Sequence, residues 1–150
     1  MGGGKQNGHS KNVTLDDSSI QTGPKAKRNA GVILVVDDDD ATCEAIREFL
    51  EEEGYRTAQA SDGHQALTMV QQPGFKPDLM LLDLMMPTMD GWQLRARLHA
   101  DPALATIPIV IMTAHAAMLR ALVNAEPQTP VLRKPLDLDR LLEVVATYCA

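Results

Sequence analysis

Aromatic residues are scarce in this 150-residue chain, at 3%, whereas hydrophobic residues make up 45% of it. A chain of this size and apolar content can bury one sizeable core, and with so few aromatic side chains that core has to be aliphatic. Long hydrophobic runs are also lacking, because runs such as Val32–Val36 fall far short of the roughly 18 residues that a membrane span needs. The sequence therefore predicts a single domain that has no membrane segment.

Secretion and redox signals are missing too. The N-terminus has no apolar stretch of the kind found in a secretory signal. The myristoylation pattern that begins at Gly2 is broken, because Gln6 stands where Ser or Thr is needed. With only two cysteines, Cys43 and Cys149, we expect a cytoplasmic protein whose thiols form no functional disulfide and bind no metal.

Composition divides the chain near residue 30. Residues 1–30 are rich in Gly, Ser, Asn, Thr and Lys, show no apolar periodicity, and predict a disordered N-terminal tail. They hold 5 of the 14 basic and 2 of the 20 acidic residues, which leaves residues 31–150 with a net charge of −9. A charge of that sign argues against direct nucleic acid binding by the folded domain, because such binding depends on cationic contacts to phosphates.

From residue 31 onward, short apolar strands alternate with amphipathic helices. The expected strands are Val32–Val36, Tyr55–Ala60, Asp78–Leu82, Ile109–Thr113 and Val131–Arg133. The expected helices follow residue 40, cover about 64–72, 91–100 and 116–124, and begin after Asp137 as N-cap in the last unit. Five βα units predict an α/β fold with a doubly wound, five-stranded parallel sheet, flavodoxin-like (βα)5, of strand order 2-1-3-4-5.

Polar side chains stand where four of these strands end. Asp37 and Asp38 follow the first strand, Asp83 the third, Thr113 ends the fourth, and Lys134 follows the fifth. The carboxyl ends of parallel strands share one edge of a sheet, so these side chains should converge. Clustered carboxylates repel one another, and a hard divalent cation such as Mg²⁺ relieves that repulsion. Without metal, removal of either Asp37 or Asp38 is accordingly expected to raise stability.

Two neighbouring features have structural explanations. Asp39 and Asp40 suit a helix N-terminus, where acidic side chains interact favourably with the macrodipole, and Asp40 is a candidate N-cap. Pro87 and Gly91 shape the loop after Asp83, with Gly91 expected to adopt a backbone conformation that other residues resist.

Four segments, VVDDDD, LLDLMMPTMDG, IVIMTA and RKP, occur in register with the five βα units. In this order they resemble the signature of the receiver domain of two-component response regulators, over residues 31–150. The resemblance implies that Asp83 accepts a phosphoryl group from a histidine kinase or a histidine phosphotransfer protein. It also implies that Mg²⁺ is bound directly by Asp38, Asp83 and the backbone carbonyl of Met85, and through water by Asp37.

Thr113 and Lys134 complete the site that the resemblance implies. Lys134 can pair with Asp83 before phosphorylation and with a phosphoryl oxygen afterwards, and its peptide bond to Pro135 is expected to be cis. The Thr113 hydroxyl can donate to another phosphoryl oxygen. We therefore expect a phosphoacceptor signalling domain with self-catalysed phosphotransfer and autodephosphorylation, rather than an enzyme that acts on a separate substrate.

The chain departs from the receiver pattern after the fourth strand. Val131 occupies a position that is often aromatic in receivers, and AEPQTP replaces the usual Gly-Ala before the last strand. Coupling through a turning aromatic ring is therefore not expected here. We expect a change at Thr113 to propagate through backbone displacement of the following loop and of the helix near Ala116.

Two other functions were compared with this one. A hydrolase of the haloacid dehalogenase type also uses a strand-end aspartate and Mg²⁺, but it needs a second aspartate where Met85 stands. A pseudo-receiver that binds partners without phosphorylation is disfavoured by the complete set of site residues. No second domain follows within the printed sequence, so output is expected through contacts with a downstream protein, unless the chain is part of a longer regulator or hybrid kinase.

Overall fold

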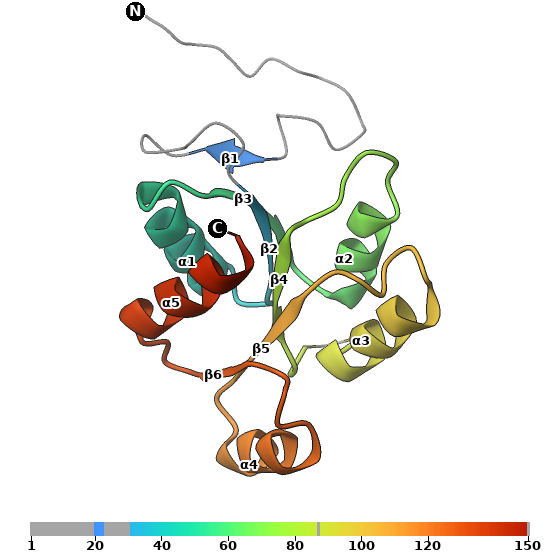
Figure 1. The fold of residues 1–150 in the computed structure, drawn as a ribbon, viewed down its shortest axis with the longest axis vertical. Coiled ribbons are helices and arrows are strands. Elements are labelled where there is room, and N and C mark those ends of the chain that lie inside the picture. The colour runs from blue at the N-terminus through green and yellow to red at the C-terminus, as the bar shows by residue number, and fades with distance from the viewer. Residues whose placement is uncertain (1–19, 23–30, 87, 150) are drawn as a thin grey trace, which may run out of the picture.

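The structure is a computed structural model that describes residues 20–22, 31–86 and 88–149. Pro87 and most of the predicted tail lie outside the described residues. The strands are β1 (Gln21–Thr22), β2 (Val32–Val36), β3 (Arg56–Ala60), β4 (Leu79–Asp83), β5 (Ile109–Thr113) and β6 (Val131–Arg133). The helices are α1 (Asp40–Glu52), α2 (Gly63–Val70), α3 (Gly91–Ala100), α4 (Ala116–Ala125) and α5 (Leu138–Tyr148), as Figure 1 shows.

All described strands form one sheet, in the order β1-β3-β2-β4-β5-β6. Strands β2 to β6 run parallel to their neighbours, so the predicted order 2-1-3-4-5 is confirmed for the five parallel strands. Strand β1 was not predicted. It adds a short antiparallel edge by pairing Gln21 with Thr57 and Thr22 with Arg56.

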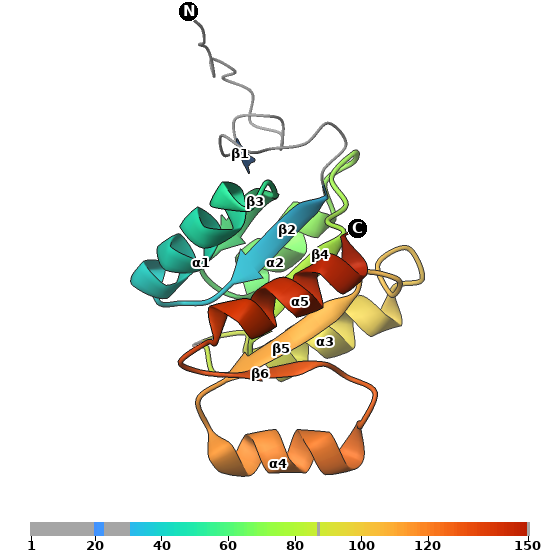
Figure 2. The same ribbon diagram turned by 60° about the vertical axis from the view of Figure 1, so that its left-hand side comes forward.

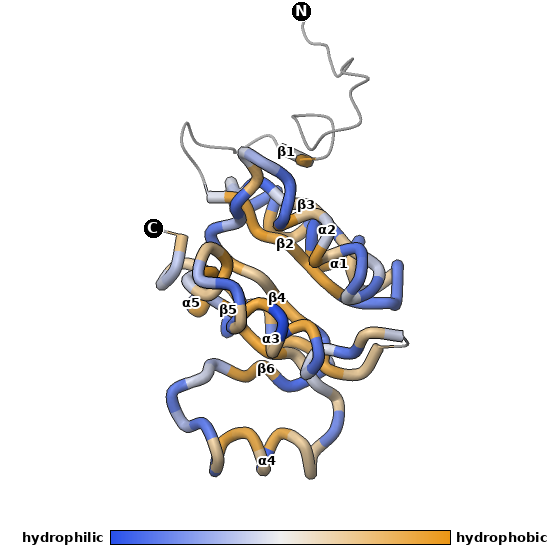
Figure 3. The backbone as a smooth tube through the Cα atoms, turned by 90° about the vertical axis from the view of Figure 1, so that its right-hand side faces the viewer, coloured by the Kyte–Doolittle hydropathy of each residue, from blue (hydrophilic) through white to orange (hydrophobic). Residues whose placement is uncertain are grey.

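Helices cover both faces of the sheet. Figures 1 and 2 show α1 and α5 on one face and α2 and α3 on the other, while α4 lies at the end of the molecule beyond β6. Side chains alternate along each strand between the two layers: Leu34 and Leu82 pack beneath α2 and α3, whereas Val35 and Leu81 pack beneath α1 and α5. Figure 3 shows that the strands consist largely of hydrophobic residues. A parallel sheet of this composition is buried on both faces, here by the helices.

Both buried layers are almost entirely aliphatic, as the shortage of aromatic residues predicts, and Phe75 is the one aromatic side chain among the buried residues described. Cys43 belongs to one layer and is fully buried, and burial raises the pKa of its thiol to about 12. Cys43 and Cys149 are both free thiols. None of the helices that the structure describes has the length and apolar character required to cross a membrane.

The start of α1 differs from the prediction. The N-cap is Asp39, not Asp40: the Asp39 carboxylate accepts hydrogen bonds from the Ala41 amide at 3.2 Å and the Thr42 hydroxyl at 2.7 Å. The Thr42 hydroxyl bond in particular lowers the pKa of Asp39. Asp40 lies in the first helical turn instead, where an acidic side chain is still favourable.

Gly91 is required for a reason other than the one predicted. Its φ angle is not positive, unlike that of Gly54, which follows α1 with φ 100. A Cβ at Gly91 would stand 2.7 Å from both the Asp83 carbonyl oxygen and the Leu84 Cα. Close packing of α3 against the end of β4 therefore excludes a side chain here, and this packing fixes the backbone that carries Asp83.

Candidate functional site

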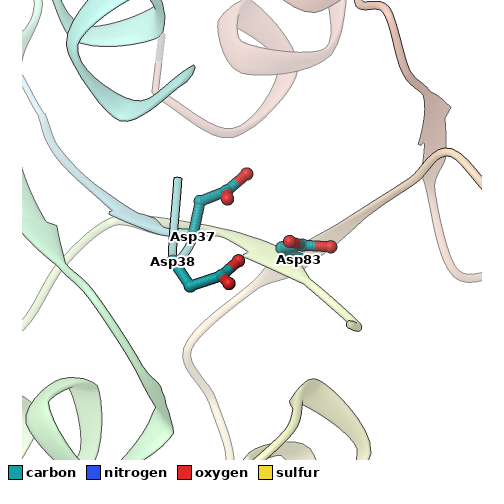
Figure 4. A group of neighbouring side chains, drawn as sticks. All are labelled: Asp37, Asp38 and Asp83. Atoms are coloured by element: carbon teal, nitrogen blue, oxygen red, sulfur yellow. The ribbon is translucent and has the colours of Figure 1, made fainter. Parts of the chain in front are cut away.

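Three carboxylates meet at the carboxyl edge of the sheet. Asp37 and Asp38 follow β2, and Asp83 is the last residue of β4, which lies beside β2. Figure 4 shows the three side chains turned toward a common space. One oxygen of each lies within 4.8 Å of the others, which is close enough for all three to serve one metal ion. The predicted convergence is confirmed for these residues.

Lys134 enters the same space from the end of β6. Its Nζ lies 2.5 Å from Asp37 Oδ2 and 3.4 Å from Asp83 Oδ2. The pairing with Asp83 agrees with the sequence analysis, but the shorter contact to Asp37 was not predicted. Strand order does not account for it, because β4, which carries Asp83, lies nearer to β6 than β2 does. The contact is possible because a lysine stem is long enough to reach past Asp83 to the end of β2.

The two buried carboxylates are held by backbone amides. Asp37 is fully buried, and its Oδ1 accepts a hydrogen bond of 2.9 Å from the Asp39 amide. Asp83 is 5% exposed, and its Oδ1 accepts one of 3.2 Å from the Met85 amide. Asp38 is exposed, so it is the carboxylate most accessible from solvent. The site thus combines two fixed carboxylates with an open side.

Burial and charge act on the titration of this cluster. Burial raises the pKa of Asp83, and the nearby charge of Asp37 raises it further, against the opposing effects of the Met85 amide and Lys134. For Lys134, burial acts to lower the pKa, but the hydrogen bond and charge of Asp37, together with the charge of Asp83, raise it overall. The ammonium therefore stays charged and offsets part of the carboxylate repulsion.

Thr113 ends β5 and is fully buried. Its Oγ1 accepts a hydrogen bond of 3.0 Å from the His115 amide, which leaves the hydroxyl proton available for another acceptor. Its carbonyl oxygen accepts one of 2.9 Å from the Lys134 amide. Thr113 is therefore bonded directly to the loop that begins α4 and to the residue that carries the ammonium.

Three further residues lie near these positions. Met85 is 50% exposed beside the site, His115 is exposed as the N-cap of α4, and Val131 is partly buried against the core. The peptide bond between Lys134 and Pro135 is cis, as the resemblance implied. The His115 amide was missed as a partner of Thr113, because a bond from a backbone group leaves no signature in residue type.

The site chemistry suits a hard cation. Every side chain in the cluster apart from Lys134 offers carboxylate oxygen, and the buried pair Asp37 and Asp83 has only one ammonium between two negative charges. Oxygen ligands and residual negative charge are what Mg²⁺ requires. The residues present therefore fit the metal.

Comparison with known proteins agrees with this geometry. The family model described as the response regulator receiver domain matches residues 33–146. An uncharacterized 14.6 kDa protein of Leptolyngbya boryana is 36% identical over 123 residues, covering 78% of this chain and 88% of that protein. The DNA-binding response regulator MtrA of Mycolicibacterium smegmatis is 48% identical over 82 residues, covering 55% of this chain and 34% of MtrA. The chain thus spans about a third of the length of that regulator.

Solved structures give the same result. The receiver domain of a signal transduction histidine kinase from Syntrophus aciditrophicus superposes with a TM-score of 0.70 at 31% identity, covering 79% of this chain and 89% of that one. A response regulator receiver protein from Pseudomonas putida gives a TM-score of 0.71 at 25% identity, covering 81% and 99%. With the family match, the shared sheet order and the carboxylate edge, the chain belongs to the response regulator receiver domain family.

Proposed function

We propose that this domain is a phosphorylation-controlled switch in which Asp83 accepts a phosphoryl group in a Mg²⁺-dependent reaction. The observation that carries the proposal is the convergence of Asp37, Asp38 and Asp83 within 4.8 Å, with Lys134 Nζ 3.4 Å from Asp83. A lone strand-end aspartate would need none of these neighbours. Phosphoryl transfer needs them, because its catalysis consists mainly of positioning and charge stabilisation.

Mg²⁺ would be held by Asp38, Asp83 and the Met85 carbonyl oxygen directly, and by Asp37 through water. The difference between Asp37 and Asp38 is supported by their contacts: Asp37 already accepts bonds from Lys134 and the Asp39 amide, whereas Asp38 is exposed. When bound, the metal supplies positive charge beside the transferring phosphoryl oxygens.

The chain's own residues supply the rest of the reaction. An Asp83 carboxylate oxygen forms the new P–O bond while the P–N bond of a phosphohistidine donor breaks and the imidazole leaves. Lys134 then pairs with a phosphoryl oxygen, which its Nζ can reach because it already lies 3.4 Å from Asp83 Oδ2. The Thr113 hydroxyl donates its free proton to a second phosphoryl oxygen.

The donor is proposed to be a histidine kinase or a histidine phosphotransfer protein, and the recipient of the signal a downstream protein. The relative MtrA is described as DNA-binding, but the match covers only 34% of it. For residues 31–150, the net charge of −9 disfavours direct contact with nucleic acid. Output from this domain is therefore proposed to occur through protein contacts.

A small phosphodonor tests the proposal. Incubation of the full chain with acetyl phosphate and Mg²⁺ should give one base-labile phosphoryl adduct by intact mass, and EDTA should abolish it. Asp83→Asn should give none while remaining folded by circular dichroism. Asp139→Asn, which changes an exposed aspartate on α5, should be labelled like the wild type. Equal labelling of Asp83→Asn would exclude Asp83 as the acceptor.

A further inference from the structure

Helix α4 is the helix that apolar packing holds least. Among the described residues, Leu122 is its one buried side chain, whereas each of the other four helices buries at least three residues. Val123 of the same helix is 51% exposed. Figure 2 shows α4 beyond β6, at the end of the molecule. Its contact with the core is through Leu122 and the partly buried Met118, so core packing constrains the direction of this helix less than that of the others.

The C-terminal end of α4 is tied to α3 by a polar cluster. Arg95 of α3 donates from its Nη1 and Nη2 to the two carboxylate oxygens of Glu126, the C-cap of α4. The Nη1–Oε2 distance is 2.9 Å. Thr129, in the following loop, donates its hydroxyl to Glu126 at 3.0 Å and accepts from Arg95 at 3.3 Å. Arg95 is only 14% exposed, so solvent screens this pair incompletely.

The N-terminal end of α4 is tied differently. Its N-cap, His115, has no side-chain capping bond, and the His115 amide instead donates to Thr113 Oγ1 at 3.0 Å. One end of the helix is thus attached to a residue of the phosphoryl site, and the other end to a neighbouring helix that packs closely on β4 through Gly91. The two attachments share no residue, so a change at Thr113 can alter the N-terminal attachment of α4 without breaking the C-terminal one.

We propose that Arg95, Glu126 and Thr129 form a latch that fixes the C-terminal end of α4, so that a change at Thr113 turns the helix about Glu126 instead of releasing it. The three residues are defined here as the α3–α4 latch. The latch itself follows from the contacts of Arg95, Glu126 and Thr129, while its action as a pivot rests on the proposed function. AEPQTP, the segment that departs from the receiver pattern, supplies both Glu126 and Thr129.

Hydrogen–deuterium exchange of the full chain, without phosphodonor, tests the latch. Arg95→Met keeps the aliphatic stem but removes both charged bonds, and should make the amides of the last turn of α4 exchange about tenfold faster. Arg97→Met is the matched control: Arg97 is exposed on the same helix and makes no ion pair with the residues that the structure describes. It should leave α4 exchange unchanged.

Two more variants keep the test decisive. Thr129→Val removes only the bridging hydroxyl and should give a smaller acceleration in the same amides. The double variant Arg95→Glu with Glu126→Arg reverses the charges and should restore much of the protection that Arg95→Met loses. Unchanged α4 exchange in Arg95→Met, or an equal acceleration in β4 and β5, would overturn the latch.

A second measurement tests the pivot. Beryllofluoride with Mg²⁺, used as a phosphoryl mimic, should change exchange in the wild type mainly in the first turn of α4, and in Arg95→Met along the whole helix. The same response in both proteins would refute the pivot. Failure of the wild type to bind beryllofluoride would refute the proposed function, and with it the pivot, while the first measurement still decides the latch.

Discussion

At the scale of single residues, Asp37 and Asp38 show how position separates two identical side chains. Both follow β2, but Asp37 turns inward, is fully buried, and accepts bonds from Lys134 and the Asp39 amide. Asp38 is exposed and accepts no hydrogen bond from the described residues. Carboxylate repulsion alone predicted that loss of either would stabilise the metal-free protein. The contacts change this expectation for Asp37.

Asp37→Ala should destabilise the metal-free protein by about 1–3 kcal/mol, because it removes the acceptor of the partly buried Asp39 amide and leaves the Lys134 ammonium without its closer partner. Asp38→Ala should leave metal-free stability unchanged or slightly raised, and should weaken Mg²⁺ binding more than Asp37→Ala does. Urea unfolding without metal and calorimetric Mg²⁺ titration measure the two effects. Equal stability of both variants without metal would contradict the structural distinction.

Thr88 is a second residue whose environment makes a prediction. It has φ 60, and the structure describes no other non-glycine residue with a positive φ. A β-branched residue is strained in this region, by roughly 1–2 kcal/mol. Thr88→Gly should therefore raise stability by about 0.5–1 kcal/mol after the entropy of glycine is subtracted. Ser61→Gly, in an exposed loop without positive φ, should lower stability slightly, and urea midpoints for the two should move in opposite directions.

At the scale of elements, the parallel strands were predictable because both their apolar composition and the turn residues between them indicate them. Most are short apolar runs, three have the predicted bounds, and the bounds of β3 and β4 differ from the predicted ones by one position. Strand β1 was not predictable, because Gln21 and Thr22 lie in a polar segment, and strand pairing between backbone groups leaves no pattern in residue type. The N-cap of α1 was missed since four consecutive aspartates offer equivalent candidates, and only the Thr42 hydroxyl distinguishes Asp39.

The site was predictable to the same extent and for a similar reason. Asp83, Thr113 and Lys134 each stand at a strand end, and sheet topology alone brings strand ends together. The preference of Lys134 for Asp37 depends instead on distances across the edge of the sheet, as does the Arg95–Glu126 pair between α3 and α4. Contacts that depend on such distances leave no pattern in a single sequence.

The coupling of β5 to α4 makes a prediction at this scale. Thr113→Ala removes the hydroxyl that accepts the His115 amide, so phosphorylation of Asp83 should proceed while the accompanying change in α4 is lost. Val131→Ala should preserve that change, because valine is short and stiff at χ1 and sweeps little volume. NMR amide shifts with and without beryllofluoride check both variants. Full shifts in Thr113→Ala, or their loss in Val131→Ala, would show that the signal takes another route.

For the whole molecule, the buried and ionised Asp83 carboxylate opposes folding in the absence of metal. The fold gathers Asp37 and Asp83 at one sheet edge with a single ammonium between them, and the chain as a whole carries a net charge of −6. Other features of the fold, such as the two buried layers and the capped helices, stabilise it whether or not metal is bound. Stability should therefore depend on pH and on Mg²⁺ through Asp83 in particular.

The pH dependence has a definite sign. Because burial and the charge of Asp37 raise the pKa of Asp83 above its ordinary value of 3.8, the folded state binds the proton more tightly than the unfolded state. The corresponding stabilisation is present at low pH and is lost as the pH rises from that value through the raised pKa. Other carboxylates titrate in the same range, so the comparison requires a variant in which only Asp83 is silent.

Asp83→Asn is the variant that this comparison requires, since an amide does not titrate. Without Mg²⁺, the wild type should lose stability relative to Asp83→Asn as the pH rises above about 4, with a slope of at most about 1.4 kcal/mol per pH unit. Saturating Mg²⁺ should reverse the difference at neutral pH, because the metal binds the ionised Asp83 of the folded wild type and stabilises it by mass action. Urea unfolding of both proteins across this pH range, with Mg²⁺ and with EDTA, measures all four curves. If the free energies of unfolding of the two proteins change with pH in the same way in EDTA, the ionised Asp83 carboxylate does not destabilise the fold. If the difference between the two free energies is the same in Mg²⁺ as in EDTA, this carboxylate does not bind the metal.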